Sequence, residues 1–377
     1  MALNASFLDK LPEEDKIIFS YIITNKIPVT FKEKTTGPHF NTYSFAPEIG
    51  FKLPCLKGMA ENLNFLIGTE GISVSTEDQL IKLIVPIKNS PVIDYKSYLY
   101  DLSKEIALRE NNDVPYLPLG IDTAGRKEFI PILSCPHVLI SGSTGTGKSN
   151  YLSVLLTTWL MLYDKDKISV DVVDIKGVDL VFFKDFPIIN NYIRTIPDFS
   201  KLLDSLELLV KKRLHQFSGK YRNIKEYNKS TNNKMPYKII LVDEFGSISA
   251  EYKNKKAELQ DAGIADPMGK LLFLSQLSRA AGVHFILSTQ RASVKIITGD
   301  IKANFPTRIS FRLPSEIDSR IALDSGGAEE LLSCGDMLIK RPDKASLQRC
   351  HVPYISVEDM SQLVNYKLSY GASELMV

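Results

Sequence analysis

Cysteine and net charge are both scarce in this sequence of 377 residues. It contains four cysteines, no two of which form a C-x-x-C pair, so a metal ribbon, a redox motif and a disulfide scaffold are all disfavoured. This cysteine usage indicates a reducing, cytoplasmic compartment. Lysine and arginine number 46 against 44 acidic residues, and the formal net charge of +2 excludes a protein that binds nucleic acid through bulk charge. Any contact with DNA or RNA must therefore be local.

Long hydrophobic runs are also missing. The most apolar stretch, residues 151–163, is shorter than the roughly 20 residues that cross a bilayer, and Ser153, Thr157 and Thr158 interrupt it. The first ten residues lack the basic and apolar regions of a signal peptide. We therefore expect a soluble, cytoplasmic protein with no membrane segment in this chain, which reaches a membrane only if a partner recruits it.

The chain divides into two parts with different sequence patterns. The first part has helical spacing over 9–24 and 59–67 around a stretch rich in Gly and Pro, residues 35–56, followed by alternation over 79–87 that predicts a strand. From about residue 117, short apolar runs alternate with helical periodicity, which indicates an α/β fold with a mostly parallel sheet flanked by helices. These runs are residues 137–140, 168–173, 238–242, 283–288 and 308–313. We predict a small α+β domain over 1–115, an α/β domain over 116–360 and a C-terminal tail over 361–377.

One segment of the second part matches the phosphate-binding pattern G-x-x-x-x-G-K-S. It follows a predicted strand and precedes a predicted helix, which is the context that this motif requires. The glycines let backbone N–H groups surround phosphate oxygens, Lys148 reaches the β- and γ-phosphates, and Ser149 binds Mg²⁺. The sequence therefore predicts ATP and Mg²⁺ as cofactors. The motif comprises Gly142, Ser143, Thr144, Gly145, Thr146, Gly147, Lys148 and Ser149.

Polar residues at the ends of two further strands complete a predicted hydrolytic site. Asp243 and Glu244 follow the apolar run 238–242, which we expect to neighbour the strand of the phosphate loop. Asp243 suits the Mg²⁺ shell, and Glu244 can polarise the attacking water. Gln290 follows the run 283–288, at a position suited to sensing a γ-phosphate or a water. An adjacent Asp-Glu pair points to hydrolysis.

Several longer segments resemble the FtsK/SpoIIIE family of DNA translocases. The resemblance covers roughly residues 118–357, and residues 37–89 are more weakly similar to the smaller domain that precedes the motor in that family. It implies a RecA-like P-loop NTPase core, and the compact form resembles the proteins of conjugative or mobile elements. The matching segments are residues 222–228, 276–284, 288–291, 297–308, 317–320 and 335–338.

The resemblance also implies an assembly and several residue roles. Members of the family form rings, with a hexamer expected, around double-stranded DNA, and ATP lies between subunits. Arg279 matches the arginine that a neighbouring subunit supplies to the site, with Arg308 and Arg320 as further candidates. Arg291 and Lys302 match positions that face the DNA backbone, where contacts are independent of sequence.

Three departures from the family pattern affect these expectations. Glu316 stands where the family often has a basic residue, which removes one expected phosphate contact, and Lys295 is close enough in sequence to compensate. The family's D-P-K appears as residues 174–176 with isoleucine in place of proline. An insertion includes residues 251–261, whose lysines form either a DNA- or partner-contacting loop or an ordinary solvated face.

The leading hypothesis is an ATP-driven translocase of double-stranded DNA, active in conjugative transfer or in the mobilisation of a mobile element, and recruited by a protein such as a relaxase or recombinase. A secretion-type ATPase that energises protein export is the second hypothesis, and Arg291 and Lys302 favour DNA over it. The third is a nucleotide-gated ring assembly factor without processive work. Glu244 and Gln290 argue against this third possibility, because they equip the site for hydrolysis.

Overall fold

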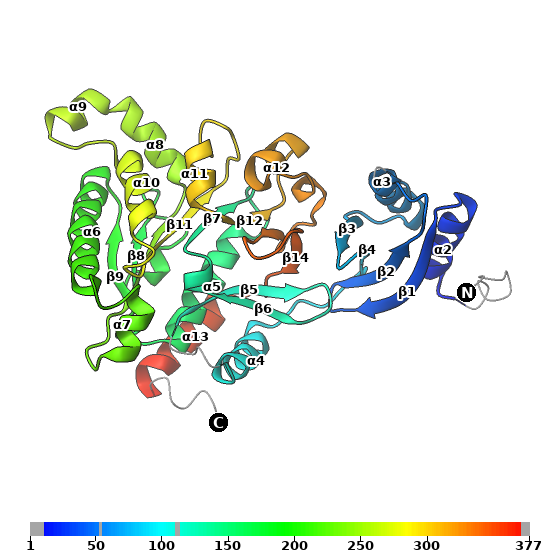
Figure 1. The fold of residues 1–377 in the computed structure, drawn as a ribbon, viewed down its shortest axis with the longest axis horizontal. Helices are drawn as coiled ribbons and strands as arrows, with labels where there is room; N and C mark the ends of the chain where they lie inside the picture. Colours follow the sequence, from blue (N-terminus) through cyan, green and yellow to red (C-terminus); the bar gives the residue numbers. More distant parts are fainter. Residues whose placement is uncertain (1–10, 53–54, 110–113, 371–377) are drawn as a thin grey trace.

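The computed structural model describes residues 11–52, 55–109 and 114–370, and it contains two β-sheets (Figure 1). A four-stranded sheet lies at the N-terminal end of the molecule, and a ten-stranded sheet forms the centre of the larger part. No helix within these residues is long and apolar enough to cross a membrane. The expectation about a signal peptide concerns residues 1–10, which lie outside the described residues.

The smaller sheet is antiparallel, with the strand order β1-β2-β4-β3. Ile81, Leu83 and Val85 of β4 are buried in one cluster with side chains of α2 and α3, as the alternation in the sequence predicts. Strand β2 lies inside the Gly- and Pro-rich stretch, for which no strand was predicted. The elements are α2 (Glu13–Thr24), β1 (Val29–Thr36), β2 (Phe40–Pro47), α3 (Cys55–Ile67), β3 (Ser73–Glu77) and β4 (Leu80–Pro86).

The larger sheet has the strand order β6-β5-β14-β13-β12-β7-β11-β10-β8-β9. The strands from β12 to β9 in this order are parallel, and the remaining pairs are antiparallel. This arrangement confirms the predicted mostly parallel sheet. It corrects one expectation, because β11 lies between β7, which precedes the phosphate loop, and β10, which precedes Asp243. The strands are β5 (Tyr116–Asp122), β6 (Lys127–Pro131), β7 (His137–Ser141), β8 (Ile168–Val173), β9 (Ile189–Ile193), β10 (Tyr237–Val242), β11 (Val283–Thr289), β12 (Thr307–Phe311), β13 (Asp336–Lys340) and β14 (Gln348–His351).

Helices cover both faces of the larger sheet, because its central strands are apolar on both sides. In β10, Ile239 and Leu241 belong to one buried cluster with α4, α5 and α13, whereas Ile240 and Val242 belong to a second cluster with α6, α8 and α10. The helices of this part are α4 (Tyr95–Ala107), α5 (Lys148–Leu162), α6 (Ile196–Phe217), α7 (Ile224–Ser230), α8 (Phe245–Asn254), α9 (Lys256–Asp261), α10 (Pro267–Leu277), α11 (Gly299–Asn304), α12 (Glu316–Leu323) and α13 (Val357–Tyr370).

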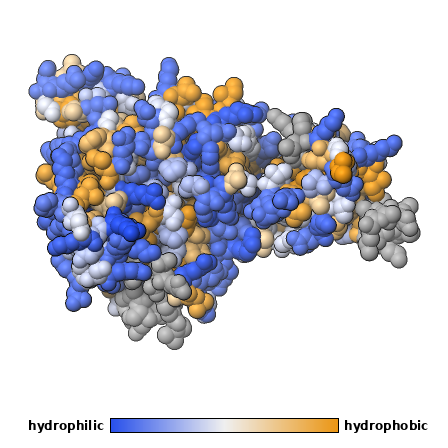
Figure 2. Space-filling model, in the orientation of Figure 1, coloured by the Kyte–Doolittle hydropathy of each residue, from blue (hydrophilic) through white to orange (hydrophobic). Residues whose placement is uncertain are grey.

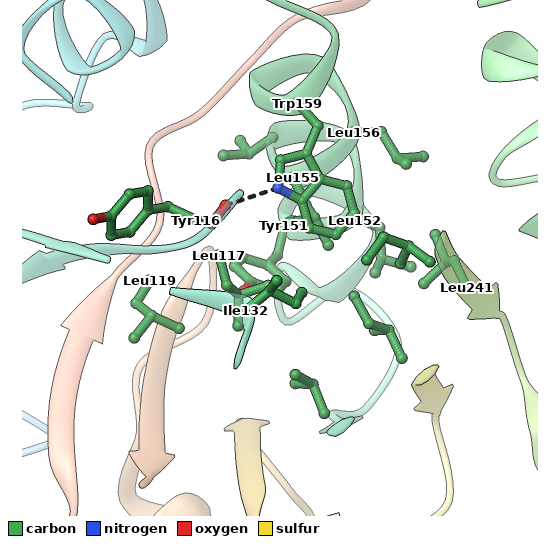
Figure 3. Close-up of a cluster of buried hydrophobic side chains, with 14 of the residues drawn as sticks. Tyr116, Leu117, Leu119, Ile132, Tyr151, Leu152, Leu155, Leu156, Trp159 and Leu241 are labelled. Carbon is green, nitrogen blue, oxygen red and sulfur yellow. Dashed lines mark hydrogen bonds between the residues drawn. The ribbon is translucent and has the colours of Figure 1, made fainter. Parts of the chain in front are cut away.

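Helix α5 begins at the phosphate loop and is buried along most of its length. Its side chains include Trp159, the one tryptophan of the chain, which is fully buried. The Trp159 indole N–H donates a 2.8 Å hydrogen bond to the Tyr116 carbonyl on β5, and the Tyr151 hydroxyl donates one of 2.9 Å to Pro118 (Figure 3). Burial of the aromatic surface therefore leaves no polar atom of Trp159 unpaired, and it fixes α5 against the sheet.

The division of the chain after residue 115 stays a prediction. Tyr95, Leu99 and Leu102 of α4, which precede that point, are buried in the cluster of the larger sheet. We propose that the boundary lies near residue 90, where the sequence Asn89-Ser90-Pro91 interrupts the preceding strand pattern. The predicted tail also differs in part, because α13 extends to Tyr370 and packs against α5. Residues 111–113, interpreted as a linker, lie outside the described residues.

A buried ion pair connects the two sheets. Arg349 on β14 and Asp336 on β13 are 2.6 Å apart and almost completely buried. The same guanidinium donates hydrogen bonds to the Gly71 carbonyl (2.7 Å) and the Ser73 hydroxyl (2.8 Å) of the N-terminal part, and it lies over the Phe40 ring. Arg349 therefore satisfies an internal carboxylate and holds the smaller sheet against the larger one at the same time.

We predict that Arg349→Met destabilises the protein by about 3 kcal/mol or more, because it leaves the Asp336 carboxylate buried without a compensating charge. Arg320→Met is the matched control, since it removes an arginine–carboxylate pair that is exposed to solvent and worth about 1 kcal/mol or less. Urea denaturation followed by circular dichroism measures both changes. Equal losses of stability in the two variants would contradict the role assigned to Arg349.

Candidate active site

The phosphate loop connects β7 to α5 at the carboxyl edge of the larger sheet. Gly142 donates its N–H to the Thr289 carbonyl (3.3 Å), and Ser143 donates to the Arg312 carbonyl (3.0 Å), so both neighbouring strands hold the start of the loop. A Cβ at Gly142 would lie 2.7 Å from the Phe311 Cβ. Glycine is therefore required here by close packing.

The end of the loop packs against a second backbone segment. Gly147 has a φ of +114° and stands directly before α5. A Cβ at Gly147 would lie 2.6 Å from the Gly335 nitrogen, whose N–H donates a 3.0 Å hydrogen bond to the Thr146 carbonyl. Both the backbone conformation and the contact with Gly335 exclude a side chain at this position.

Lys148, the first residue of α5, is buried and paired in this structure. Its ammonium group lies 2.9 Å from a carboxylate oxygen of Asp243 and donates a hydrogen bond of 2.7 Å to the Ser288 hydroxyl. The Ser288 hydroxyl in turn donates a 2.7 Å hydrogen bond to Asp243. Lys148 and Asp243 were predicted to share a site, and the structure places them in direct contact across β11.

Glu244 is held at the end of β10 by both of its carboxylate oxygens. One accepts a hydrogen bond from the Thr289 hydroxyl (3.0 Å) and the other from the Gln290 N–H (2.9 Å). The Lys176 ammonium is 3.9 Å away and half exposed, so it contributes little. The backbone of Glu244 has a φ of +47°, in the left-handed region. A residue with a side chain pays about 1–2 kcal/mol for this conformation, as is typical of functional sites.

Gln290 and Ser149 lie at the exposed rim of the loop. The Thr144 hydroxyl donates a 3.1 Å hydrogen bond to the Gln290 side-chain carbonyl, so Gln290 contacts the phosphate loop itself. The Ser149 hydroxyl donates to Asp179 (3.2 Å), a residue of the segment that follows β8. Asp179, Ser288 and Thr289 were not predicted as site residues. Only Ser288 and Thr289 had a signal in the sequence, as hydroxyl residues at the end of an apolar strand.

The β8 segment is ordered by the aspartate that matches the start of the family's D-P-K. Asp174 is buried and accepts hydrogen bonds from the Gly177 N–H (2.8 Å), the Leu180 N–H (3.3 Å) and the Tyr192 hydroxyl (2.8 Å). Burial, and then the bond to Asp174, raise the pKa of Tyr192, which therefore stays a neutral donor. Asp174 thus positions the turn that carries Lys176 and Asp179.

The donor set fits a magnesium nucleotide. A Cβ at Gly145 would meet nothing within 4 Å, so the outer side of the loop is open. Ser149, Asp243 and Asp179 offer hydroxyl and carboxylate oxygens, the ligands that Mg²⁺ prefers. Within the described residues no group of three His, Cys, Asp or Glu side chains could hold a metal ion. Mg²⁺ commonly binds through one or two protein ligands, phosphates and water.

Arg279 is remote from the other predicted catalytic residues. It precedes β11, whereas Gln290 follows it, and a strand of seven residues spans about 23 Å. The Arg279 side chain is exposed, with one hydrogen bond to the Leu133 carbonyl at 3.3 Å. Of the other candidates, Arg308 is buried against Asp324, and Arg320 pairs with Glu316 at 2.8 Å.

The predicted DNA-binding residues occupy the loop between β11 and α11 and the helix that follows it (Figure 1). Arg291 and Lys295 are exposed there. Lys302 differs, because its ammonium group lies 2.8 Å from Asp324. Hydrogen bonds from Arg308, and then from Lys302 and Lys340, hold the pKa of Asp324 well below its ordinary range. Lys302 therefore shares a carboxylate with two other cations.

The insertion forms part of α8 and α9, which extend from the body of the molecule (Figure 1). Lys255 pairs with Glu251 at 3.0 Å, so the lysines there alternate with acidic residues.

We predict that Lys148→Met destabilises the nucleotide-free protein by about 3 kcal/mol, because Asp243 is left buried and uncompensated. The double variant Lys148→Met/Asp243→Asn recovers most of this loss. Ser149→Ala is the matched control in the same loop, and we expect little change because Ser149 is exposed. Thermal unfolding without nucleotide measures all three, and a double variant that is no more stable than Lys148→Met contradicts the assignment.

Comparison with solved structures places this fold among ATPases. The pCW3 conjugation coupling protein TcpA, in its monomer form with ATPγS, matches with a TM-score of 0.61 over 94% of this chain and 98% of that chain, at 22% identity. The cytoplasmic domain of the type VII secretion ATPase EccC from Thermomonospora curvata matches with a TM-score of 0.59 over 73% of this chain and 34% of that chain, at 23% identity. At these identities the likeness shows the fold, and it confirms the predicted P-loop core.

Sequence comparison gives the family. DNA translocase FtsK of Helicobacter pylori strain J99 is 28% identical over 379 aligned residues, which cover 97% of this chain and 43% of that protein. DNA translocase FtsK of Leptospira interrogans serovar copenhageni is 30% identical over 356 residues, 89% of this chain and 35% of that protein. The chain thus spans less than half the length of these relatives. The sequence model of the FtsK/SpoIIIE family matches residues 99–294, more than half of the chain. This protein therefore belongs to the FtsK/SpoIIIE family.

Proposed function

We propose that this chain is an ATP-driven motor that moves double-stranded DNA through the pore of a ring of identical subunits. Members of the FtsK/SpoIIIE family hydrolyse ATP, so the enzyme class follows from the family. The observation that carries the rest is the direct link between the hydrolytic residue and the basic loop. Glu244 is hydrogen-bonded to Thr289 and to Gln290, and the basic loop starts at the next residue, Arg291.

The nucleotide site changes partners when it is occupied. Bound ATP and Mg²⁺ supply the phosphoanhydride to be cleaved and the positive charge that neutralises its oxygens. Lys148 exchanges Asp243 for the phosphates, since a charge-assisted bond to phosphate replaces a bond to carboxylate. Asp243 and Ser149 are then free to hold the metal side of the site. Glu244 orients water, and Gln290 stays close to the phosphate loop through Thr144.

Coupling to DNA follows from the hydrogen bonds at the end of β11. The Arg291 N–H donates to the Thr289 hydroxyl (3.1 Å), and that hydroxyl also donates to Glu244. A change in the hydrogen bonds of Glu244 therefore reaches the loop that carries Arg291 and Lys295. Contacts from these residues to phosphates are independent of base sequence, as movement along any duplex requires.

The position of Arg279 favours an assembly of subunits. Since it lies at the opposite end of β11 from its own phosphate loop, we propose that it completes the site of a neighbouring subunit. Phe273 and Leu277 of α10, close to Arg279 in sequence, are about half exposed, which suits a surface that another copy covers. A contact between two different faces of one chain closes into a ring if the rotation permits.

A secretion-type ATPase is the alternative, and the solved structure of EccC shares this fold. The exposed cations on the loop after β11 favour DNA, because an export motor does not need phosphate contacts at that edge. Conjugative transfer or mobilisation of a mobile element, with a relaxase or recombinase as the recruiting partner and the cytoplasm as the location, is our proposed setting. The similar fold of the coupling protein TcpA supports it.

We predict that long duplex DNA stimulates ATP turnover at least tenfold and that the protein displaces a triplex-forming strand from duplex in the presence of ATP. Glu244→Gln should retain nucleotide binding but lose about 100-fold or more of the turnover, as expected for a residue that orients water. A phosphate-release assay and a triplex-displacement assay measure these effects. ATP turnover that is indifferent to duplex but stimulated by a peptide partner would instead identify the secretion alternative.

A mixing experiment tests the role of Arg279. Lys148→Ala and Arg279→Ala should each abolish DNA-stimulated turnover when present alone. In an equal mixture, about one quarter of the interfaces combine an intact Lys148 with an intact Arg279 from the neighbour, so activity should return. Size-exclusion chromatography with duplex confirms that the variants assemble. Failure of the mixture to regain activity would show that Arg279 does not act between subunits.

A further inference from the structure

The basic residues of the chain are concentrated in one segment. Residues 211–234 hold eight of the 46 lysines and arginines but one of the 44 acidic residues. The rest of the chain therefore carries 38 cationic and 43 acidic residues, a net charge of −5. The near-neutral total charge thus hides a segment of net charge +7, which comprises the end of α6, the α6–α7 turn, α7 and the loop before β10. We call its exposed surface the α7 surface.

Most of these cations are available to a partner. Lys212, Lys220, Lys229 and Lys234 are exposed, and Lys225 is half-buried. None of the five has an ion pair or hydrogen bond to another residue that the structure describes. This differs from α6, where Lys201 and Lys211 pair with acidic residues of the same helix. The lysines of the α7 surface are therefore not neutralised within the chain.

The one acidic residue of the segment has a structural role. The Asn223 side chain accepts a hydrogen bond from the Glu226 N–H (3.1 Å), and the Glu226 carboxylate accepts one from the Arg222 N–H (2.8 Å). This reciprocal arrangement caps α7. The Arg222 guanidinium lies 3.9 Å from Glu226 and is 90% exposed, so the carboxylate neutralises it weakly.

The α7 surface is built on a rigid base. Ile224 is fully buried, and the Asn228 side chain holds Met235 through two hydrogen bonds of 2.9 and 2.8 Å. Tyr227 packs against Phe217 and Tyr221 with ring centroids 5.3 Å apart in each pair. The lysines on both sides of α7 are therefore presented by an ordered backbone, and binding would cost little ordering of the chain.

The composition of the surface indicates the kind of partner. Its other exposed residues are small or polar, namely Ser218, Ser230, Asn232 and Asn233, and such groups commonly contact phosphate together with lysine and arginine. No large apolar side chain of residues 211–234 is exposed, whereas a helix that binds membranes needs an apolar face. Figure 2 shows mostly hydrophilic side chains in this region, at the lower left of the molecule.

We propose that the α7 surface binds the phosphate backbone of duplex DNA, as a second DNA contact separate from the loop that carries Arg291. Helix α7 lies at the opposite edge of the larger sheet from that loop (Figure 1). Its seven residues are about 10 Å long, which matches about three successive phosphates on one strand. The inference shares the DNA partner with the proposed function but does not require translocation.

The experiment measures how salt weakens the binding of a short fluorescent duplex to the full chain. Lys220→Gln/Lys225→Gln/Lys229→Gln/Lys234→Gln should reduce the slope of log K against log salt by about 3, since each lost phosphate contact removes about 0.9. The control is Lys253→Gln/Lys255→Gln/Lys256→Gln in the insertion, which should leave the slope unchanged. Circular dichroism and thermal unfolding confirm that both variants keep the fold.

Two outcomes overturn the inference. One is an unchanged slope in the α7 variant. The other is an unchanged slope together with loss of binding to vesicles of anionic phospholipid, which would identify a membrane surface. These results are independent of the proposed function: wild-type protein that fails to displace a triplex, with a reduced slope in the α7 variant, refutes translocation and leaves the second DNA contact standing.

Discussion

The ion pair between Lys148 and Asp243 is the interaction on which the candidate site depends. Both side chains are almost removed from water, where a charge is tolerated only if another charge or several hydrogen bonds compensate it. Ser288 joins the same network, so α5, β10 and β11 are held together at one edge of the sheet. A triphosphate that enters the loop therefore competes with Asp243 for Lys148, and binding must rearrange the edge.

The part of the fold that positions this pair could be predicted from the sequence. The runs that became β7, β8, β10 and β11 are apolar on both faces, which only a sheet covered by helices on both sides can bury. Parallel strands place their carboxyl ends at one edge, so Lys148, Asp243, Glu244 and Gln290 were expected together before any contact was known. The predicted P-loop core is confirmed for this physical reason.

The remaining contacts depend on information that a local pattern does not contain. Strand β11 separates β7 from β10, and this order makes Ser288 and Thr289 partners of Lys148 and Glu244. The contact of Ser149 with Asp179 depends on the turn after β8, which Asp174 orders through backbone N–H groups. Similarly, the antiparallel extension from β13 to β6 uses short strands whose burial is decided by the neighbours they meet.

The charge distribution shows why a sum over the chain is a poor guide to binding. Cations that share a carboxylate, as Lys302, Arg308 and Lys340 do with Asp324, contribute less to an external partner than their number suggests. Cations without an internal partner, as on α7, contribute fully. The positions of the acidic residues therefore decide where the surface attracts an anion, more than the total number of lysines and arginines.

The left-handed backbone of Glu244 has a consequence for the design of variants. Glycine would relieve the strain at this position, and a procedure that ranks sequences by folding stability alone would favour it. Such a sequence would fold well and would lack the carboxylate that contacts Thr289 and Gln290. Thermostable versions of this protein should therefore be sought with residue 244 held constant, because the most stable residue there and the functional one are different amino acids.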